Sequence, residues 1–111
     1  MNVFKKIKAY LQFRQAIITA EDAHAKDGTR YWVMPYDRGN KPHLFIVNRQ
    51  NFKILKRKGY IPKNATIADL DRECFYVTAG TGNVEPLSPK DAEYKRRVFY
   101  RWYSLVSKRK Q

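Results

Sequence analysis

The sequence predicts an α+β fold, in which long N- and C-terminal helices cover a small antiparallel sheet of about three strands in the order α-β-β-α-β-α. Apolar residues recur at helical spacing near both ends of the chain. The middle of the chain instead holds short β-branched and aromatic runs, separated by clusters of turn-forming residues. The length of 111 residues allows a single domain over residues 1–111 with one modest core.

The composition is that of a folded domain, because 43% of the residues are hydrophobic and 14% are aromatic. No apolar run approaches the roughly 20 residues that a membrane span needs, so we expect no membrane partner. The first fifteen residues lack the uninterrupted apolar segment of a signal peptide. The single cysteine, Cys74, excludes an internal disulfide framework and fits a protein retained or assembled in a reducing cytoplasm.

Residues 3 to about 26 are predicted to form a helix that Gly28 ends. At 1.5 Å per residue this helix is roughly 35 Å long, longer than a small sheet is wide. Arg14 and Glu21 fall inside its apolar arc, which leaves two alternatives. Either both side chains reach out from the edge of the core, or part of the helix leaves the domain and meets another chain. The arc consists of Val3, Ile7, Tyr10, Leu11, Ile17 and Ile18.

The next two segments are predicted to form a β-hairpin. Residues 29–36 (TRYWVMPY) and 43–48 (HLFIVN) are rich in β-branched and aromatic residues. They flank DRGNKP, a turn-forming cluster that gives a loop of about six residues. The short continuous apolar runs indicate a sheet that is covered on at least one face.

A second helix is predicted over about 49–58, with Asn48 as its N-cap and Gly59 at its end. Helical spacing turns Phe52 and Leu55 toward the core. The outward arc of this helix is basic and consists of Arg49, Lys53, Lys56 and Arg57.

Thr66 is predicted to cap a single turn, IADLDRE, which leads into a third strand, CFYVTAG. After the loop TGNVEPL, a helix start is marked by Ser88 as N-cap, Pro89 at the first helical position and Asp91. The last helix covers about 89–108. Its predicted inner side consists of Ala92, Val98, Phe99, Trp102, Leu105 and Val106, and its outer side of Arg97, Arg101, Ser104 and Lys108.

The net charge of +13 is concentrated in two blocks of the sequence. Neither block contains an acid, and together their basic residues equal the whole net charge, so the rest of the chain is balanced. Segregated charge of one sign opposes folding and therefore usually serves an anionic partner. The first block contains Arg49, Lys53, Lys56, Arg57, Lys58 and Lys63, and the second contains Lys95, Arg96, Arg97, Arg101, Lys108, Arg109 and Lys110.

The sequence contains no signature of a catalytic or metal centre. His24, His43 and Cys74 lack the spacing of zinc ligands and are interpreted as surface or packing residues. The three acids of DLDRE (69–73) could hold magnesium, but a helix start explains them better. The GTG at 80–82 lacks the Lys-Ser/Thr of a P-loop, and no nucleophile elbow is present. We therefore predict a non-enzymatic protein with no catalytic, metal-binding or cofactor-binding residues.

Aromatic residues interleave with both basic blocks, in KRKGYIPK and YKRRVFYRWYSLVSKRK. Nucleic-acid-binding proteins combine phosphate-neutralising cations with stacking aromatics. No helix-turn-helix, RNP motif or zinc finger accompanies them, so the pattern fits DNA, RNA or an acidic protein surface about equally. On the last helix Phe99 and Trp102 lie on the apolar arc. Tyr100 and Tyr103 lie off that arc and are the candidate aromatic anchors for a partner.

The stretch DGTRYWVMPYDRGNKPHLFIVNRQNFKILKRKGYI, followed by RECFYVTAG, resembles a family of small proteins of Bacteroides-type bacteria and of their crAss-like tailed bacteriophages. The resemblance is one of layout over residues 27–80: a Tyr-aromatic strand ending in Pro, a turn, an apolar strand, NRxxFxxLKxKG and an aromatic strand. It implies a small non-enzymatic virion component, such as an auxiliary or minor capsid protein. No functional residue is carried over from that family.

We therefore predict a basic structural protein of a phage particle, an auxiliary or minor capsid component that binds an acidic protein surface. It would reside in the virion, or in the host bacterial cytoplasm before assembly. The alternative is a non-specific nucleic-acid-binding protein of a phage or mobile element. The predicted partner-binding residues are Arg49, Lys53, Lys56, Arg57, Lys58, Lys63, Arg97, Arg101 and Lys108.

Overall fold

The computed structural model describes residues 2–36, 41–80 and 87–108. Most of the predicted hairpin loop and of the predicted loop TGNVEPL, together with Arg109 and Lys110 of the second basic block, lie outside the described residues. The elements in chain order are α1 (Val3–Asp27), β1 (Trp32–Tyr36), β2 (His43–Val47), α2 (Arg49–Arg57), α3 (Ile67–Glu73), β3 (Tyr76–Val77) and α4 (Pro89–Lys108). The predicted fold class is confirmed, and the single turn expected after Thr66 is the helix α3.

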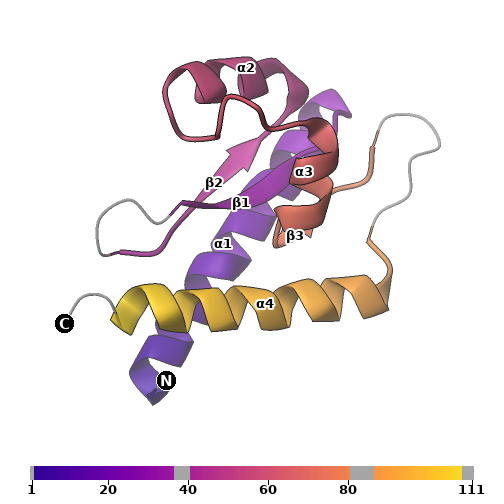
Figure 1. The fold of residues 1–111 in the computed structure, drawn as a ribbon. Helices are drawn as coiled ribbons and strands as arrows, with labels where there is room; N and C mark the ends of the chain where they lie inside the picture. Colours follow the sequence, from indigo (N-terminus) through magenta and orange to yellow (C-terminus); the bar gives the residue numbers. More distant parts are fainter. Residues whose placement is uncertain (1, 37–40, 81–86, 109–111) are drawn as a thin grey trace.

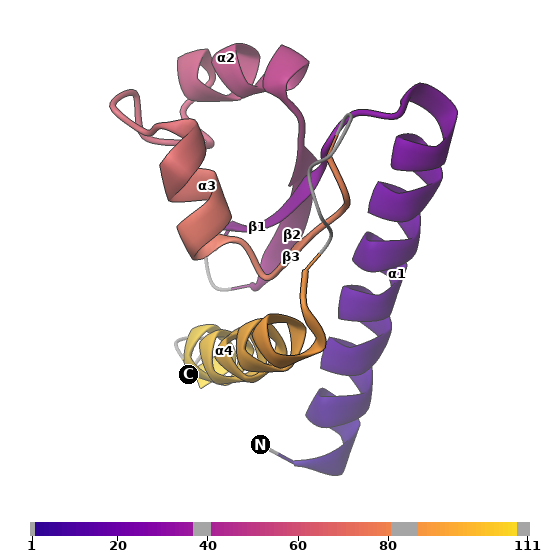
Figure 2. The ribbon, with the colours of Figure 1, turned by 90° about the vertical axis from the view of Figure 1, so that its right-hand side faces the viewer.

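The elements form three layers around a small antiparallel sheet (Figures 1 and 2). Helix α1 lies along one face of the sheet, and α2 and α3 lie over the other face. Helix α4 crosses the N-terminal half of α1 next to β3. The first turns of α1 extend beyond α4 on the side away from the sheet, so the N-terminal end of α1 is covered less than the rest of the helix.

The helix ends follow the predicted local signals. Gly28 ends α1 with a φ of 73°, and its N–H donates to the His24 carbonyl. Asn48 caps α2 in a reciprocal pair with Asn51, in which each side-chain oxygen accepts from the other residue's N–H at 2.8 Å. Ser88 Oγ accepts from the Asp91 N–H at 3.2 Å, which begins α4 as expected.

The sheet has the strand order β2-β1-β3, and β1 pairs antiparallel with both neighbours. Strand β3 contributes only two residues, which pair with Trp32 and Val33. The carbonyls of Tyr31 and Val33 accept hydrogen bonds from the β3 side, so by strand alternation Pro35 also faces that side. Because β3 does not reach Pro35, the missing N–H of the proline leaves no sheet hydrogen bond unmade. A proline is therefore tolerated in the central strand.

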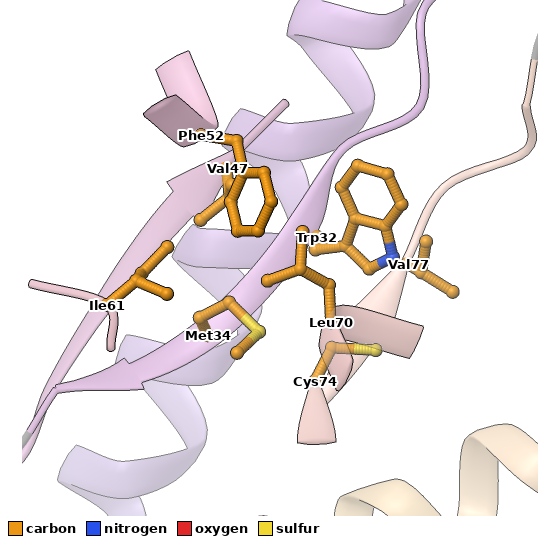
Figure 3. Packing of buried hydrophobic residues seen from close by; sticks show 8 residues of the cluster. All are labelled: Trp32, Met34, Val47, Phe52, Ile61, Leu70, Cys74 and Val77. Carbon is orange, nitrogen blue, oxygen red and sulfur yellow. The ribbon is translucent and has the colours of Figure 1, made fainter. Parts of the chain in front are cut away.

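The core on the α2 and α3 side is organised around Trp32 and Met34 of β1 (Figure 3). The Trp32 indole N–H also donates to Asp71 of α3 at 2.7 Å, which satisfies its only polar group. These two side chains pack with Val47, Phe52, Ile61, Leu70, Cys74 and Val77.

The opposite face of the sheet packs on α1 and α4. Val33 and Tyr31 contact the buried Ala20 of α1. Nearer the N-terminal end of α1, Phe13 stacks on Phe99 of α4 with ring centroids 4.4 Å apart. Ala9 is fully buried in the same cluster, which indicates that small residues allow α1 and α4 to approach closely.

The apolar arc predicted for α1 is not the buried one. Val3, Ile7, Tyr10, Leu11 and Ile18 are exposed, and of the predicted arc Ile17 alone is half-buried. The buried side chains of the helix are Ala9, Phe13 and Ala20. The helix has two apolar faces, and the face with small residues packs inward because it fits the sheet and α4 more closely.

On α4 the buried face is rotated relative to the prediction. Phe99 and Val106 are fully buried as expected, and Tyr103 is also buried. Leu105, which was predicted to be buried, is 54% exposed. The rotation follows from the crossing with α1, because Phe13 and Ala9 pack against Phe99 and Tyr103.

Substitution of Phe99 by Ala should lower the free energy of unfolding by about 3–5 kcal/mol, because the ring is fully buried among aromatic neighbours. Substitution of the exposed Leu105 by Ala should cost less than about 1 kcal/mol. Urea denaturation followed by far-UV circular dichroism measures both values. Equal losses in the two variants would contradict the packing of α4.

Candidate functional site

Helix α2 presents a row of cations to solvent, as predicted. Asn51 Nδ2 donates to the Ile46 carbonyl at 3.2 Å, and Phe52 is buried in the core, so the helix is fixed at its N-terminal end. Arg49, Lys53 and Arg57 recur every four residues and are exposed along one side. We call these three residues the α2 row. Of the predicted partner-binding residues that follow, Lys58 and Lys63 are also exposed.

Lys56 does not belong to this outward arc, and its prediction as an outward residue is wrong. The Lys56 ammonium donates to the Ala65 carbonyl at 3.2 Å and lies 4.5 Å from the centroid of the Phe52 ring. The ammonium therefore stabilises the segment after α2 through a charge-assisted hydrogen bond and a cation–π contact.

On α4, Arg97 and Arg101 are exposed as predicted. Arg97 forms an ion pair with Glu93 one turn earlier at 2.7 Å, and this hydrogen bond lowers the pKa of the Glu93 carboxyl. The side chain of Lys108, at the end of α4, lies outside the described residues. The described cations of this face are thus partly balanced by an acid of their own helix.

Lys95, which the sequence places in the second basic block, serves the fold. Its ammonium donates to the carbonyls of Asp71 and Cys74 at 2.9 Å and 3.0 Å. These carbonyls lie at the C-terminal end of α3, where unpaired acceptors and the helix dipole favour a cation.

The two tyrosines predicted as aromatic anchors differ in position. Tyr103 is only 7% exposed and packs against Phe99, so the prediction that it is free to contact a partner is wrong. Tyr100 is half-buried, with its ring 5.2 Å from Phe99 in an edge-on arrangement. The burial of each phenol raises its pKa.

The structure reveals an exposed apolar surface on α1, in which Val3, Ile7 and Leu11 belong to the predicted apolar arc and Phe4 does not. Phe4 of α1 is 80% exposed, and its neighbours on the same side of the helix are more than half exposed. We call these side chains the α1 stripe, which consists of Val3, Phe4, Ile7 and Leu11. Lys6 and Lys8, on either side of the stripe, are exposed as well. A helical wheel displays both apolar faces of α1, but only tertiary packing decides which one is left in solvent.

Three aromatic rings gather beside the C-terminal end of α2. The Tyr60 ring lies 4.8 Å from that of Tyr36 and 6.2 Å from that of Phe45. Tyr60 is 40% exposed and, with Phe45 and the buried Leu70, lines a hollow of about 390 Å³. The exposed ring of Tyr60, two residues after Lys58, places a stacking surface close to the end of the basic helix.

Two of the three acids of α3, Asp69 and Asp71, serve the fold. Asp69 forms a capping box with Thr66 and pairs with Arg72, and its pKa is lowered chiefly by the hydrogen bond from the Thr66 backbone. Asp71 accepts from Trp32. Across the described part of the chain, no three His, Cys, Asp or Glu side chains gather closely enough to hold a metal ion. Within the same residues, no helix has the length and apolarity to cross a membrane.

Comparison with models of protein families, with curated proteins and with solved structures finds no match to this chain. The surfaces described above therefore carry the functional argument by their chemistry.

Substitution of Lys56 by Ala should lower the free energy of unfolding by about 1–2 kcal/mol, because it removes a hydrogen bond to a part-buried carbonyl and a cation–π contact. The matched change of Lys53, one turn earlier and exposed, should alter it by no more than about 0.5 kcal/mol. Chemical denaturation of the two variants measures the difference. If Lys53→Ala proves as destabilising as Lys56→Ala, the assignment of Lys56 to the fold is wrong.

Proposed function

We propose that the chain is a non-enzymatic structural protein of a phage particle, an auxiliary or minor capsid component that binds an acidic protein surface. The observation that carries the proposal is the α1 stripe, an exposed apolar surface with lysines on both sides. The resemblance over residues 27–80 supports the assignment to a phage particle. The protein would then reside in the virion, or in the host bacterial cytoplasm before assembly.

The stripe favours a protein partner over a nucleic acid. Apolar patches on a monomer that exceed a few hundred Å² commonly mark interaction sites. The core of a protein interface is apolar, so it can bury the side chains of Phe4 and Ile7. A phosphate backbone binds cations but has no apolar surface against which these two side chains could pack. The stripe lies on the first turns of α1, which extend beyond the rest of the domain and are accessible to a neighbour.

The charges near the stripe favour an acidic partner over a second copy of the same chain. Residues 3–20 contain Lys5, Lys6, Lys8 and Arg14 but no acid. Two such stripes facing each other would bring lysines against lysines, which opposes association. An acidic surface would instead neutralise them, and the α2 row adds a second region of the same sign.

Mass spectrometry of purified phage particles tests the location, and the chain should be present there at many copies.

The contact itself is tested with a variant carrying Phe4→Gln and Leu11→Gln, since glutamine preserves helix propensity. This variant should bind capsids about tenfold more weakly, with a melting temperature close to that of the wild type because both side chains are exposed. The control variant Tyr94→Gln removes an exposed ring from a different helix, α4, and should bind capsids as the wild type does. Particles without the chain would contradict the proposal, as would wild-type binding by the stripe variant.

A second candidate function, non-specific nucleic-acid binding, is favoured by the exposed ring of Tyr60 beside Arg57 and Lys58. Neutralisation of roughly six phosphates would give a slope near −5 in a plot of log affinity against log salt concentration. Replacement of the α2 row by Gln should then flatten the slope by up to about three units. Tyr60→Ala should weaken binding to single strands without changing the slope. DNA binding that is insensitive to salt would contradict this function.

A further inference from the structure

A second group of cations, unrelated to the two basic blocks, surrounds a hollow at the N-terminal end of α1. The hollow has a volume of about 390 Å³, within the range of small-molecule sites. It lies between three segments that are distant in the sequence: the first half of α1, the residues that enter β2 and the end of α4. Lys5 and Lys8 of α1 line it together with Lys41 and His43. We call it the basic hollow.

The walls of the basic hollow are held by contacts of the fold. Gln12 of α1 donates from Nε2 to the Pro42 carbonyl at 3.1 Å, which fixes the helix against the start of β2. The stack of Phe13 on Phe99 fixes α1 against α4. The concave shape is therefore set by backbone positions and buried rings rather than by the exposed lysine side chains alone.

The lining of the basic hollow suits an anion with several oxygen atoms. Among the described residues that line it, none carries a carboxylate, so three ammonium groups act together in a concave site. Two buried hydroxyl residues, Tyr103 and Ser107, complete the lining. A tyrosine hydroxyl keeps its proton at neutral pH and can donate, and burial raises the pKa of Tyr103 further in the same direction.

We infer that the basic hollow binds the phosphate group of a phosphorylated ligand. A phosphate carries up to two negative charges and three strong acceptor oxygens, which match three ammonium groups and neutral hydroxyl donors better than a single carboxylate does. The phosphate belongs either to a small free molecule or to a nucleotide strand. The site is separate from the α2 row and does not include the apolar side chains of the α1 stripe.

Titration with pyrophosphate, followed by amide chemical shifts of the ¹⁵N-labelled full chain, tests the inference. The shifts should saturate at residues of the hollow, such as Gln12, His43 and Ser107. The variant Lys5→Gln/Lys41→Gln should raise the dissociation constant about tenfold. The control Lys53→Gln/Arg57→Gln removes the same charge from α2 and should raise it by less than about twofold.

Equal weakening in both double variants, or binding by Lys5→Gln/Lys41→Gln that matches the wild type, would overturn the inference. A single variant, Lys41→Gln, changes an exposed side chain and keeps the test decisive if the double variant does not fold.

A parallel titration with a single-stranded oligonucleotide identifies the source of the phosphate. Selective weakening by Lys5→Gln/Lys41→Gln in both titrations indicates a nucleotide strand, and in the pyrophosphate titration alone a free molecule. The stripe variant Phe4→Gln/Leu11→Gln should bind pyrophosphate normally, so failure here and failure of the capsid proposal are distinguishable.

Discussion

The fold depends on the burial of β1 from both sides. Trp32, Val33 and Met34 are consecutive and all buried, and strand alternation turns the first and third toward α2 and α3 and the second toward α1. A strand that is apolar on both faces requires a cover on each. One cover is α2 with α3, and the other is α1 with α4. This requirement places α1, which carries the α1 stripe, and α2, which carries the α2 row, on opposite sides of the sheet.

The same packing decides which cations remain available to a partner. Lys95 lies close to the carbonyls at the end of α3 and donates to two of them. Lys56 bridges from α2 to the Ala65 carbonyl. Lys95 places its charge at the carbonyls left unpaired at the end of α3, and Lys56 places its charge at a carbonyl of the segment between α2 and α3, so part of the basic composition supports the fold. The α2 row faces solvent because Phe52 is the buried anchor of that helix.

Much of the fold could be predicted from the sequence because the signals are local. The caps at Asn48, Thr66 and Ser88, and the glycine after α1, act within one helical turn and appear in the structure as expected. The buried face of α1 and the burial of Tyr103 in place of Leu105 on α4 could not be predicted, since each depends on the shape of the neighbouring helix. Ala9 packs inward because α4 crosses there. The basic hollow was also beyond sequence reasoning, because its lining joins residues from both ends of the chain and from the entry to β2.

The positive charge of the chain opposes the self-association that the exposed apolar α1 stripe would otherwise promote. A stripe that includes Phe4 at 80% exposure would by itself promote self-association. Lys6 and Lys8 beside the stripe, and a net charge of +13 on every copy, oppose that contact at both short and long range. With an acidic partner, the interaction of Lys6 and Lys8 and the interaction of the net charge both become attractive. The same residues that disfavour a second copy therefore favour the partner. On the proposed function, the apolar side chains supply binding free energy and the cations supply the choice of partner.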